Sequence, residues 1–179
     1  MKKSQHVLKN LFLCLFTIAL VISCDEVEEL TQVDIDNTIT ENISVQVAAG
    51  DEDIQSFSKS MTIGIDNQEI NNNRDKIEGL VINAMSYTFK NVNGNEEALV
   101  SGSLNIGGKI VTIDQTNPLE DQVNQIVTQI QDPSFLNDVA VLLKNNESID
   151  LILTGNAENA PVDFTMELKL DVTATVEGL

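Results

Sequence analysis

The sequence is poor in the side chains that most often carry enzyme chemistry. Its 179 residues contain no tryptophan, one histidine (His6), two cysteines (Cys14 and Cys24) and 4% aromatic residues. A Ser-His-Asp or Cys-His nucleophile system needs an imidazole base, and zinc, haem and iron–sulfur sites need histidine or cysteine ligands. His6 and Cys14 fall in an N-terminal segment that we expect to be removed. These chemistries are therefore excluded from the rest of the chain.

The N-terminal segment has the pattern of an export signal. Lys2, Lys3 and Lys9 make its start positive, and Leu11–Ile22 form an apolar core of twelve residues. This length suits the core of a signal peptide and falls short of the ~20 residues that span a bilayer. We therefore interpret the segment as a signal peptide and not as a transmembrane anchor.

The apolar core ends in the residues "VISC", Val21–Cys24. This tetrapeptide resembles the lipobox of bacterial lipoproteins. In that family the signal is cut just before the cysteine, and the thiol then carries a diacylglyceryl group. The resemblance implies that residues 1–23 are a lipoprotein signal peptide and that Cys24 is the lipid attachment site, detectable by palmitate labelling. It makes a membrane the first expected partner.

Removal of residues 1–23 would leave 156 residues with seven basic and 28 acidic side chains, a net charge of −21. This length is typical of one domain with a sizeable core. So negative a domain would be repelled by phosphate, so we expect no nucleic-acid partner. With Cys24 lipidated, the mature chain has no histidine and no free thiol. We expect no disulfide, no cofactor and no metal site of the zinc or iron type.

An acidic cluster, Asp25–Glu29 ("DEVEE"), directly follows Cys24. Like charges repel and keep a linker extended, so residues 24–37 are interpreted as a lipidated cysteine and an acidic tether. The cluster is also similar to the surface-export signal of Bacteroidetes-type lipoproteins, whereas aspartate after the cysteine of enterobacterial lipoproteins resembles an inner-membrane retention signal. The asparagine-rich composition favours the first. We expect a lipid-anchored location at the outer membrane or cell surface, the alternative being the periplasmic face of a membrane.

Residues 38–179 show the period-two alternation of β-strands. In the C-terminal stretch 162–177, every even position from Val162 to Val176 is apolar and every odd position is polar. This pattern predicts one buried and one exposed face of an antiparallel strand, so long that it should bend or serve two sheets. Shorter patterns of the same kind are centred on the following residues: Ile43–Val47, Phe57–Ile65, Val81–Phe89, Val100–Ile106, Lys109–Ile113 and Ile149–Leu153. Gly107-Gly108 predicts a two-residue hairpin, and Asp66–Lys76 is the longest polar loop.

Residues 118–144 break the strand pattern. Leu119, Val123, Ile126, Val127 and Ile130 form a helical stripe, with Asn117 as cap and Pro118 at the first helical position. Asp132-Pro133 repeats the cap before a second amphipathic stretch, in which Phe135, Leu136, Val139, Leu142 and Leu143 should face inward. We predict an all-β antiparallel sandwich of about eight strands, jelly-roll or immunoglobulin-like, with a two-helix insert that covers an open end, the alternative being a lid that forms a groove. The chain resembles small surface lipoproteins of Bacteroidetes type.

Three function classes follow, and none has a diagnostic motif in the domain. The first is a non-catalytic module of the envelope or cell surface that binds a protein or assembles with others. The second is a carbohydrate-binding lipoprotein, aided by calcium if Asp51–Asp53 or the Asp66 loop binds the ion. Sugars stack on exposed rings, yet most aromatic residues of the mature chain (Phe57, Tyr87, Phe89, Phe135, Phe164) fall in apolar registers. The third is a glycoside hydrolase, which needs two opposed carboxylates that nothing singles out here.

Overall fold

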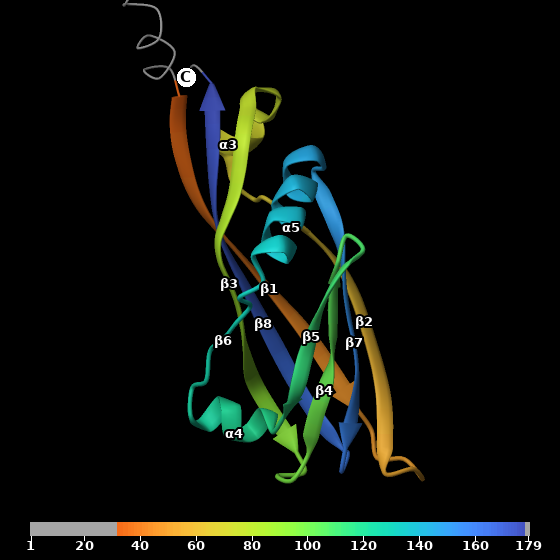
Figure 1. Cartoon of the computed structure of the whole chain (residues 1–179). Helices are drawn as coiled ribbons and strands as arrows, with labels where there is room; N and C mark the ends of the chain where they lie inside the picture. The colour runs from red at the N-terminus through yellow and green to blue at the C-terminus, as the bar shows by residue number, and fades with distance from the viewer. Residues whose placement is uncertain (1–31, 178–179) are drawn as a thin grey trace, which may run out of the picture. The chain divides into compact units, whose positions relative to one another are not determined.

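The computed structural model describes residues 32–177. The predicted signal peptide, the predicted lipid site Cys24 and the first part of the predicted tether lie outside the described residues. The elements, shown in Figure 1, are β1 (Gln32–Val47), β2 (Ile54–Gly64), α3 (Gln68–Asn72), the 3-10 turn η1 (Arg74–Lys76), β3 (Ile77–Gly94), β4 (Leu99–Ile106), β5 (Lys109–Thr116), α4 (Pro118–Val123), β6 (Thr128–Gln129), α5 (Pro133–Asn145), β7 (Ser148–Glu158) and β8 (Val162–Glu177).

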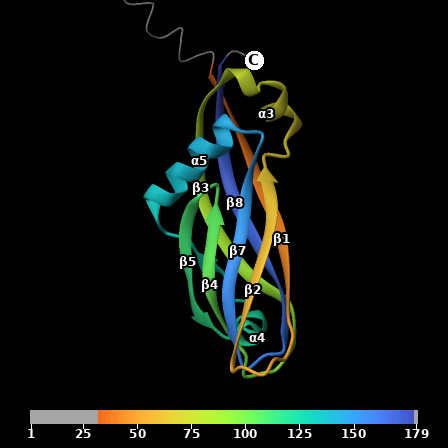
Figure 2. The same ribbon diagram turned by 90° about the vertical axis from the view of Figure 1, so that its right-hand side faces the viewer.

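The strands form two antiparallel four-stranded sheets that pack face to face (Figure 2), which confirms the predicted all-β sandwich. One sheet has the order β1-β8-β3-β6 and the other β2-β7-β4-β5. Consecutive strands such as β1 and β2, or β7 and β8, therefore lie in different sheets. That connectivity is the jelly-roll arrangement, whereas the first two strands of an immunoglobulin-like sandwich share a sheet. Of the two topologies left open by the sequence, the structure has the jelly roll.

The C-terminal strand β8 lies between β1 and β3 in the first sheet. All eight of its even positions, from Val162 to Val176, are buried, and its odd positions are exposed or half-buried. The predicted register is therefore confirmed. The strand belongs to one sheet along its whole length, so the option that it would serve two sheets is wrong.

Strand β1 begins at Gln32, so residues 32–37 belong to the sheet and not to the tether assigned from the sequence. Its exposed face is joined to β8 by side-chain hydrogen bonds: Thr173 Oγ1 donates to Asp36 Oδ1 (2.6 Å) and Thr175 Oγ1 to Asp34 Oδ1 (2.7 Å). The tether prediction failed because these aspartates looked like solvated charge, whereas each of them accepts a hydrogen bond from the neighbouring strand.

One apolar residue expected in the core, Val81, is 57% exposed. The register of β3 against β8 shifts between Ile82 and Ala84, which marks a β-bulge. A bulge adds a residue and reverses which side chains point inward. Ile82 is buried before the shift and Met85 after it, so Val81 falls on the outer face.

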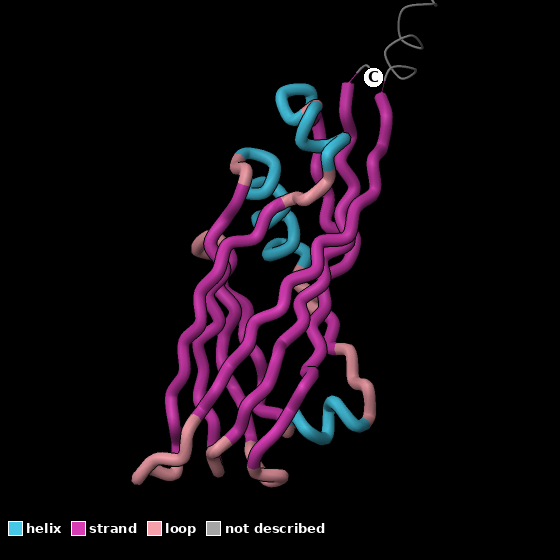
Figure 3. Tube along the Cα trace, turned by 180° about the vertical axis from the view of Figure 1, so that it is seen from behind, coloured by secondary structure: helices cyan, strands magenta, loops and turns pink. Residues whose placement is uncertain are grey.

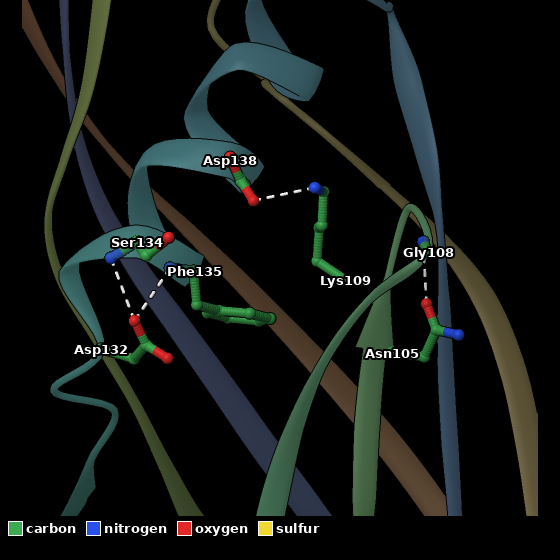
Figure 4. Close-up of polar contacts among 7 residues, drawn as sticks. All are labelled: Asn105, Gly108, Lys109, Asp132, Ser134, Phe135 and Asp138. Carbon is green, nitrogen blue, oxygen red and sulfur yellow. Dashed lines mark hydrogen bonds and ion pairs between the residues drawn. The ribbon is translucent and has the colours of Figure 1, made fainter.

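The predicted hairpin turn at Gly107-Gly108 and the predicted cap of the second helix are both present (Figure 4). Gly107 and Gly108 have φ of 57° and 88°, which two-residue hairpins require, and Gly108 N–H donates to Asn105 Oδ1 (2.8 Å). At the start of α5, Asp132 Oδ1 accepts from the backbone N–H groups of Ser134 (3.0 Å) and Phe135 (3.1 Å). This is the N-cap expected from the sequence.

Helix α5 lies against β3 and across the turn between β4 and β5. Lys109, just after that turn, forms an ion pair with Asp138 of α5 (2.8 Å, Figure 4), and Lys144 of α5 donates to the Glu78 carbonyl on β3. Phe135, Val139 and Leu143 are buried as predicted. Leu136 and Leu142 are partly buried against the core. The helix thus covers this end of the second sheet.

Two parts of the secondary structure differ from the prediction. The polar loop Asp66–Lys76 contains α3, capped by Asn67, whose Oδ1 accepts from Glu69 N–H (2.9 Å) and Ile70 N–H (3.1 Å). Buried Ile70 is the apolar anchor of this one-turn helix. The helix predicted through Ile130 ends at Val123, and a short strand, β6, follows it.

Candidate interaction surface

The acidic candidates for a calcium site do not come together. Within residues 32–177, no group of three or more histidine, cysteine, aspartate or glutamate side chains is arranged to hold a metal ion. Asp51, Glu52 and Asp53 lie on the turn between β1 and β2, with their side chains exposed. Cys24, the predicted lipid site, is outside the described residues. The described chain also contains no helix long and apolar enough to cross a bilayer.

The aromatic side chains are used in the core. Phe57, Phe164 and Phe89 form two successive edge-to-face contacts, with ring centroids 5.8 and 5.3 Å apart, and Tyr87 adds a third at 5.8 Å from Phe89. Phe135, in the first turn of α5, is buried as well. In the part of the chain that the structure describes, every aromatic ring is buried or half-buried. These residues therefore leave no exposed ring on which a sugar could stack.

A different feature stands out at the edge of the first sheet, where residues 117–130 lie beside β3 (Figure 3). We call these residues the edge segment. Its first part is capped by Asn117, whose Oδ1 accepts from Leu119 N–H (3.0 Å) and Glu120 N–H (3.1 Å). Gln122 then accepts from the backbone N–H of Val92 on β3 (2.8 Å). A side chain thus takes the place of a neighbouring strand at this point of the edge.

The helix in the edge segment ends in a Schellman motif. Gln125 has φ of 54°, its N–H donates to the Gln122 carbonyl (3.2 Å), and Ile126 N–H donates to the Asp121 carbonyl (2.9 Å). An apolar residue at the position of Ile126 usually packs on an apolar residue one turn back in the helix. Here that position holds Glu120 or Asp121, so Ile126 has no such partner within the motif.

Beyond the Schellman motif the edge segment pairs with β3 directly. Thr128 and Gln129 of β6 lie opposite Tyr87 and Ser86, and Ile130 N–H donates to the Met85 carbonyl (2.9 Å). Ile130 is buried, so it fastens the end of the segment. The edge of β3 is thereby covered at two places, by Gln122 at Val92 and by β6 at Tyr87 and Ser86. Residues 123–127 connect these two places.

This arrangement leaves three aliphatic side chains exposed within five residues. Val123 is 70%, Ile126 42% and Val127 53% exposed. We call them the apolar triad. Scattered exposed aliphatics are common in soluble proteins, whereas a local group of them marks a contact surface more often. The triad is held by a fixed backbone, because Val123 and Ile126 lie within the Schellman motif and the β6 pairing follows Val127.

Asparagine side chains join the turns at the same end of the sandwich. Asn117 Nδ2 donates to the Glu96 carbonyl (2.7 Å), and Asn159 Nδ2 donates to the Glu97 carbonyl (3.1 Å). Asn95 Nδ2 in turn donates to the Asn159 carbonyl (2.9 Å). These bonds connect the start of α4, the β3–β4 turn and the β7–β8 turn, and so hold this end of the sandwich in one arrangement.

These connected turns carry acid. The carboxylates at this end are Asp51, Glu52, Asp53, Glu96, Glu97, Glu120, Asp121 and Glu158, which we call the acidic end. Among residues 32–177, no lysine or arginine lies on these turns or in the edge segment. The ion pairs of the described chain involve Glu167 and Asp138, not these carboxylates. Among the described residues, none of these eight carboxylates forms an ion pair with a lysine or arginine, and Asp121 Oδ2 accepts a hydrogen bond from Thr116 Oγ1 (2.7 Å).

The opposite end uses its cations structurally. Arg74 donates through Nη2 to the carbonyls of Leu143 (3.2 Å) and Asn146 at the C-terminus of α5. Lys109 and Lys144 bind α5 to the second sheet and to β3, as described above. Both ends of the sandwich thus carry acid, and they differ in their cations. The opposite end has acids such as Asp75, Asp138 and Glu147 together with Arg74, Lys109 and Lys144, whereas the turns beside the apolar triad carry carboxylates without a described lysine or arginine.

The environment of Tyr87 reflects this charge. Burial raises the pKa of its hydroxyl, a hydrogen bond with Thr128 of β6 lowers it, and the carboxylates of Asp121 and Asp114 raise it further. Tyr87 is buried, lies opposite Thr128 of β6 in the same sheet and is hydrogen-bonded to it, so it belongs to the framework that holds the edge segment.

Sequence reasoning missed this surface because it assigned the triad to the buried stripe of a longer helix. No glycine or proline marks the helix end at Val123, since the next two residues are Asn124 and Gln125. The signal that was present is the pair Glu120-Asp121, which replaces the apolar residues that would have packed on Ile126.

Comparisons with known proteins add the following. No protein-family model matches the chain, and no curated protein matches it.

Among solved structures it is similar to viral capsid proteins. The decameric BFDV capsid protein aligns with a TM-score of 0.39 at 9% identity, over 79% of this chain and 99% of that chain. The turnip yellow mosaic virus structure gives 0.31 at 11% identity, over 80% and 96%. The nodavirus of the prawn Macrobrachium rosenbergii gives 0.30 at 7% identity, over 82% and 96%. Likenesses at this level carry no argument about function.

Proposed function

We propose that the chain is a lipid-anchored, non-catalytic module of the outer membrane or cell surface that binds another protein. The observation that carries the binding role is the apolar triad, three aliphatic side chains held in the open by a fixed backbone. Burying an aliphatic side chain of this size is favourable by ~1.5–3 kcal/mol. A partner surface that covers the triad would recover this free energy, which the folded chain alone leaves unused.

Two further observations support a binding role over the alternatives. The described aromatic rings are buried, so the residues 32–177 lack the stacking platform that a carbohydrate-binding module uses. The mature chain has neither histidine nor a free thiol, and among residues 32–177 no group of three or more carboxylates is arranged to hold a metal ion such as calcium. The anchor itself rests on the lipobox at Cys24 and stays a prediction.

Photo-crosslinking in the native envelope tests the proposal. A photoreactive amino acid would replace Val127 in the full chain, and a matched variant would carry it at Ile110, which is 64% exposed on β5, away from the triad. We expect a defined protein adduct from position 127 that is absent at position 110. Equal adduct patterns from both positions would show that the triad is ordinary surface, and the proposal would be wrong.

A further inference from the structure

We propose that the apolar triad and the acidic end together form the docking surface for a cationic protein segment, one that presents aliphatic side chains flanked by lysine or arginine. This inference rests on the proposed function, and it names the chemistry of the partner. Its starting point is contiguity. Glu120 and Asp121 lie within one helical turn of Val123, and Ile126 N–H is bonded to the Asp121 carbonyl.

The backbone that carries these carboxylates is preorganised. The acids are Asp51–Asp53, Glu96 and Glu97 on the turns, Glu120 and Asp121 on α4, and Glu158 at the end of β7. Asparagine side chains hold the turns together, and no described lysine or arginine lies on these turns or in the edge segment. A cationic partner would therefore meet only acidic charge at this end, and little backbone entropy would be lost when it binds.

The apolar triad supplies the binding free energy that charged side chains alone do not. Exposed ion pairs contribute little to affinity, and they mainly set the rate and the choice of partner. Interfaces gain most of their free energy from a small buried apolar centre surrounded by a polar rim. In this surface the triad would be the centre, and Glu96, Glu97, Glu120 and Asp121 would be part of the rim.

Charge also argues against two other occupants. A second copy of the chain would bring its own acidic surface, since residues 32–177 hold 24 acidic side chains against seven basic ones. A self-complementary contact would then place like charges opposite each other. A bilayer containing anionic lipids would be repelled by the same carboxylates. Both occupants remain outcomes that the experiment below distinguishes.

The test uses the full chain and three fluorescent ten-residue peptides. The peptides alternate isoleucine with lysine, with serine or with glutamate. The triad variant carries Val123→Ser, Ile126→Ser and Val127→Ser, and Ile110→Ser is its control. The acid variant carries Glu96→Gln, Glu97→Gln and Glu120→Gln. Its control, Asp75→Asn, Glu147→Gln and Asp150→Asn, removes the same charge near the opposite end of the sandwich.

We expect the lysine peptide to bind and the glutamate peptide not to bind, as measured by fluorescence anisotropy. The triad variant should bind the lysine peptide about tenfold more weakly or worse. The acid variant should also bind more weakly, and its affinity should depend less on salt between ~0.05 and ~0.5 M because fewer charges are left to be screened. Both controls should bind like the parent. Equal losses in the acid variant and its control would mean unspecific attraction, and the inference would be wrong.

The crosslinked species from position 127 separates the two proposals. If the adduct is a protein whose binding does not respond to salt or to the acid variant, the protein-binding role stands and the cationic partner is refuted. An adduct with a second copy of the chain, or with lipid, likewise refutes the cationic partner. If position 127 gives no adduct beyond that of position 110, the protein-binding role itself fails.

Discussion

Leu168 provides the sharpest test of the fold. It is 0% exposed, lies opposite Tyr87 in the central strand β8, and has a strand on each side. Truncation to alanine removes buried methyl groups from a position where neither flanking strand can collapse into the space. Such changes cost ~2–5 kcal/mol of unfolding free energy, and we expect Leu168→Ala to cost about 3–4 kcal/mol. This is a large share of the ~5–15 kcal/mol that stabilises a typical domain.

The matched control is the next residue, Lys169→Ala. Lys169 is exposed, and its Nζ lies 3.5 Å from Glu167, which is also bonded to Lys90 at 2.6 Å. An exposed pair of this kind contributes ~0–1 kcal/mol. Both variants end in alanine on the same strand, so differences in strand propensity largely cancel. Leu168→Asp should fail to accumulate as folded protein, since it buries an unpaired carboxylate.

Equilibrium urea unfolding measures both costs. We expect the midpoint of Leu168→Ala to fall sharply and that of Lys169→Ala to stay near the parent, with similar dependence of the free energy on urea. If the two variants lose equal stability, or if Lys169→Ala loses more, the register of β8 and its central place in the sheet are wrong.

Three further predictions concern the anchor, the chemistry and the pH dependence. Cys24→Ser should abolish palmitate labelling and release the chain from membranes; undiminished labelling would disprove the lipid site. Elemental analysis of the purified chain should find no stoichiometric zinc, iron or copper, because the mature sequence lacks histidine and a free thiol. Burial raises the pKa of the Glu41 carboxyl, so the folded state binds that proton more tightly and its stability rises as the pH falls through the folded pKa. Glu41→Gln should therefore have a higher melting temperature than the parent at about pH 7 and lose this advantage at about pH 4. If the difference in melting temperature is the same at both pH values, the Glu41 carboxyl does not cause it.

The parts of the fold that could be predicted from the sequence are those where one structural requirement restricts which amino acids can occupy a position. Strand β8 needs one fully buried face, and its even positions supply only apolar side chains. The Gly107-Gly108 turn needs two positive φ angles, and the caps Asn117 and Asp132 need a short acceptor side chain before a proline. In each case local chemistry and the tertiary fold agree.

Strand β1 was only partly predicted because it lies at an edge of the sheet. Its inward positions include Asn37 and Glu41, both half-buried, among the buried Ile35, Ile39 and Ile43. These two polar residues interrupt the alternation that would have marked the strand. Inward-pointing polar and charged side chains at an edge strand also discourage pairing with other chains, which is a known way in which natural sheets avoid aggregation.

The edge segment shows how the fold overrides a helical pattern. A helix continued through Ile130 would satisfy its own backbone, but it would leave the edge groups of β3 near Val92 and Met85 without partners. The structure instead ends α4 at Val123 and uses Gln122, β6 and Ile130 N–H to satisfy that edge.

The apolar stripe of the pattern is thereby divided. Leu119 and Ile130 pack against the core, and Val123, Ile126 and Val127 face solvent. Covering a sheet edge accounts for the residues that bond to β3, but it does not require the exposed positions between them to be aliphatic. Serine or lysine would serve there equally well for the fold, so a surface that contacts another molecule is the simplest physical reason for three aliphatic side chains at this place.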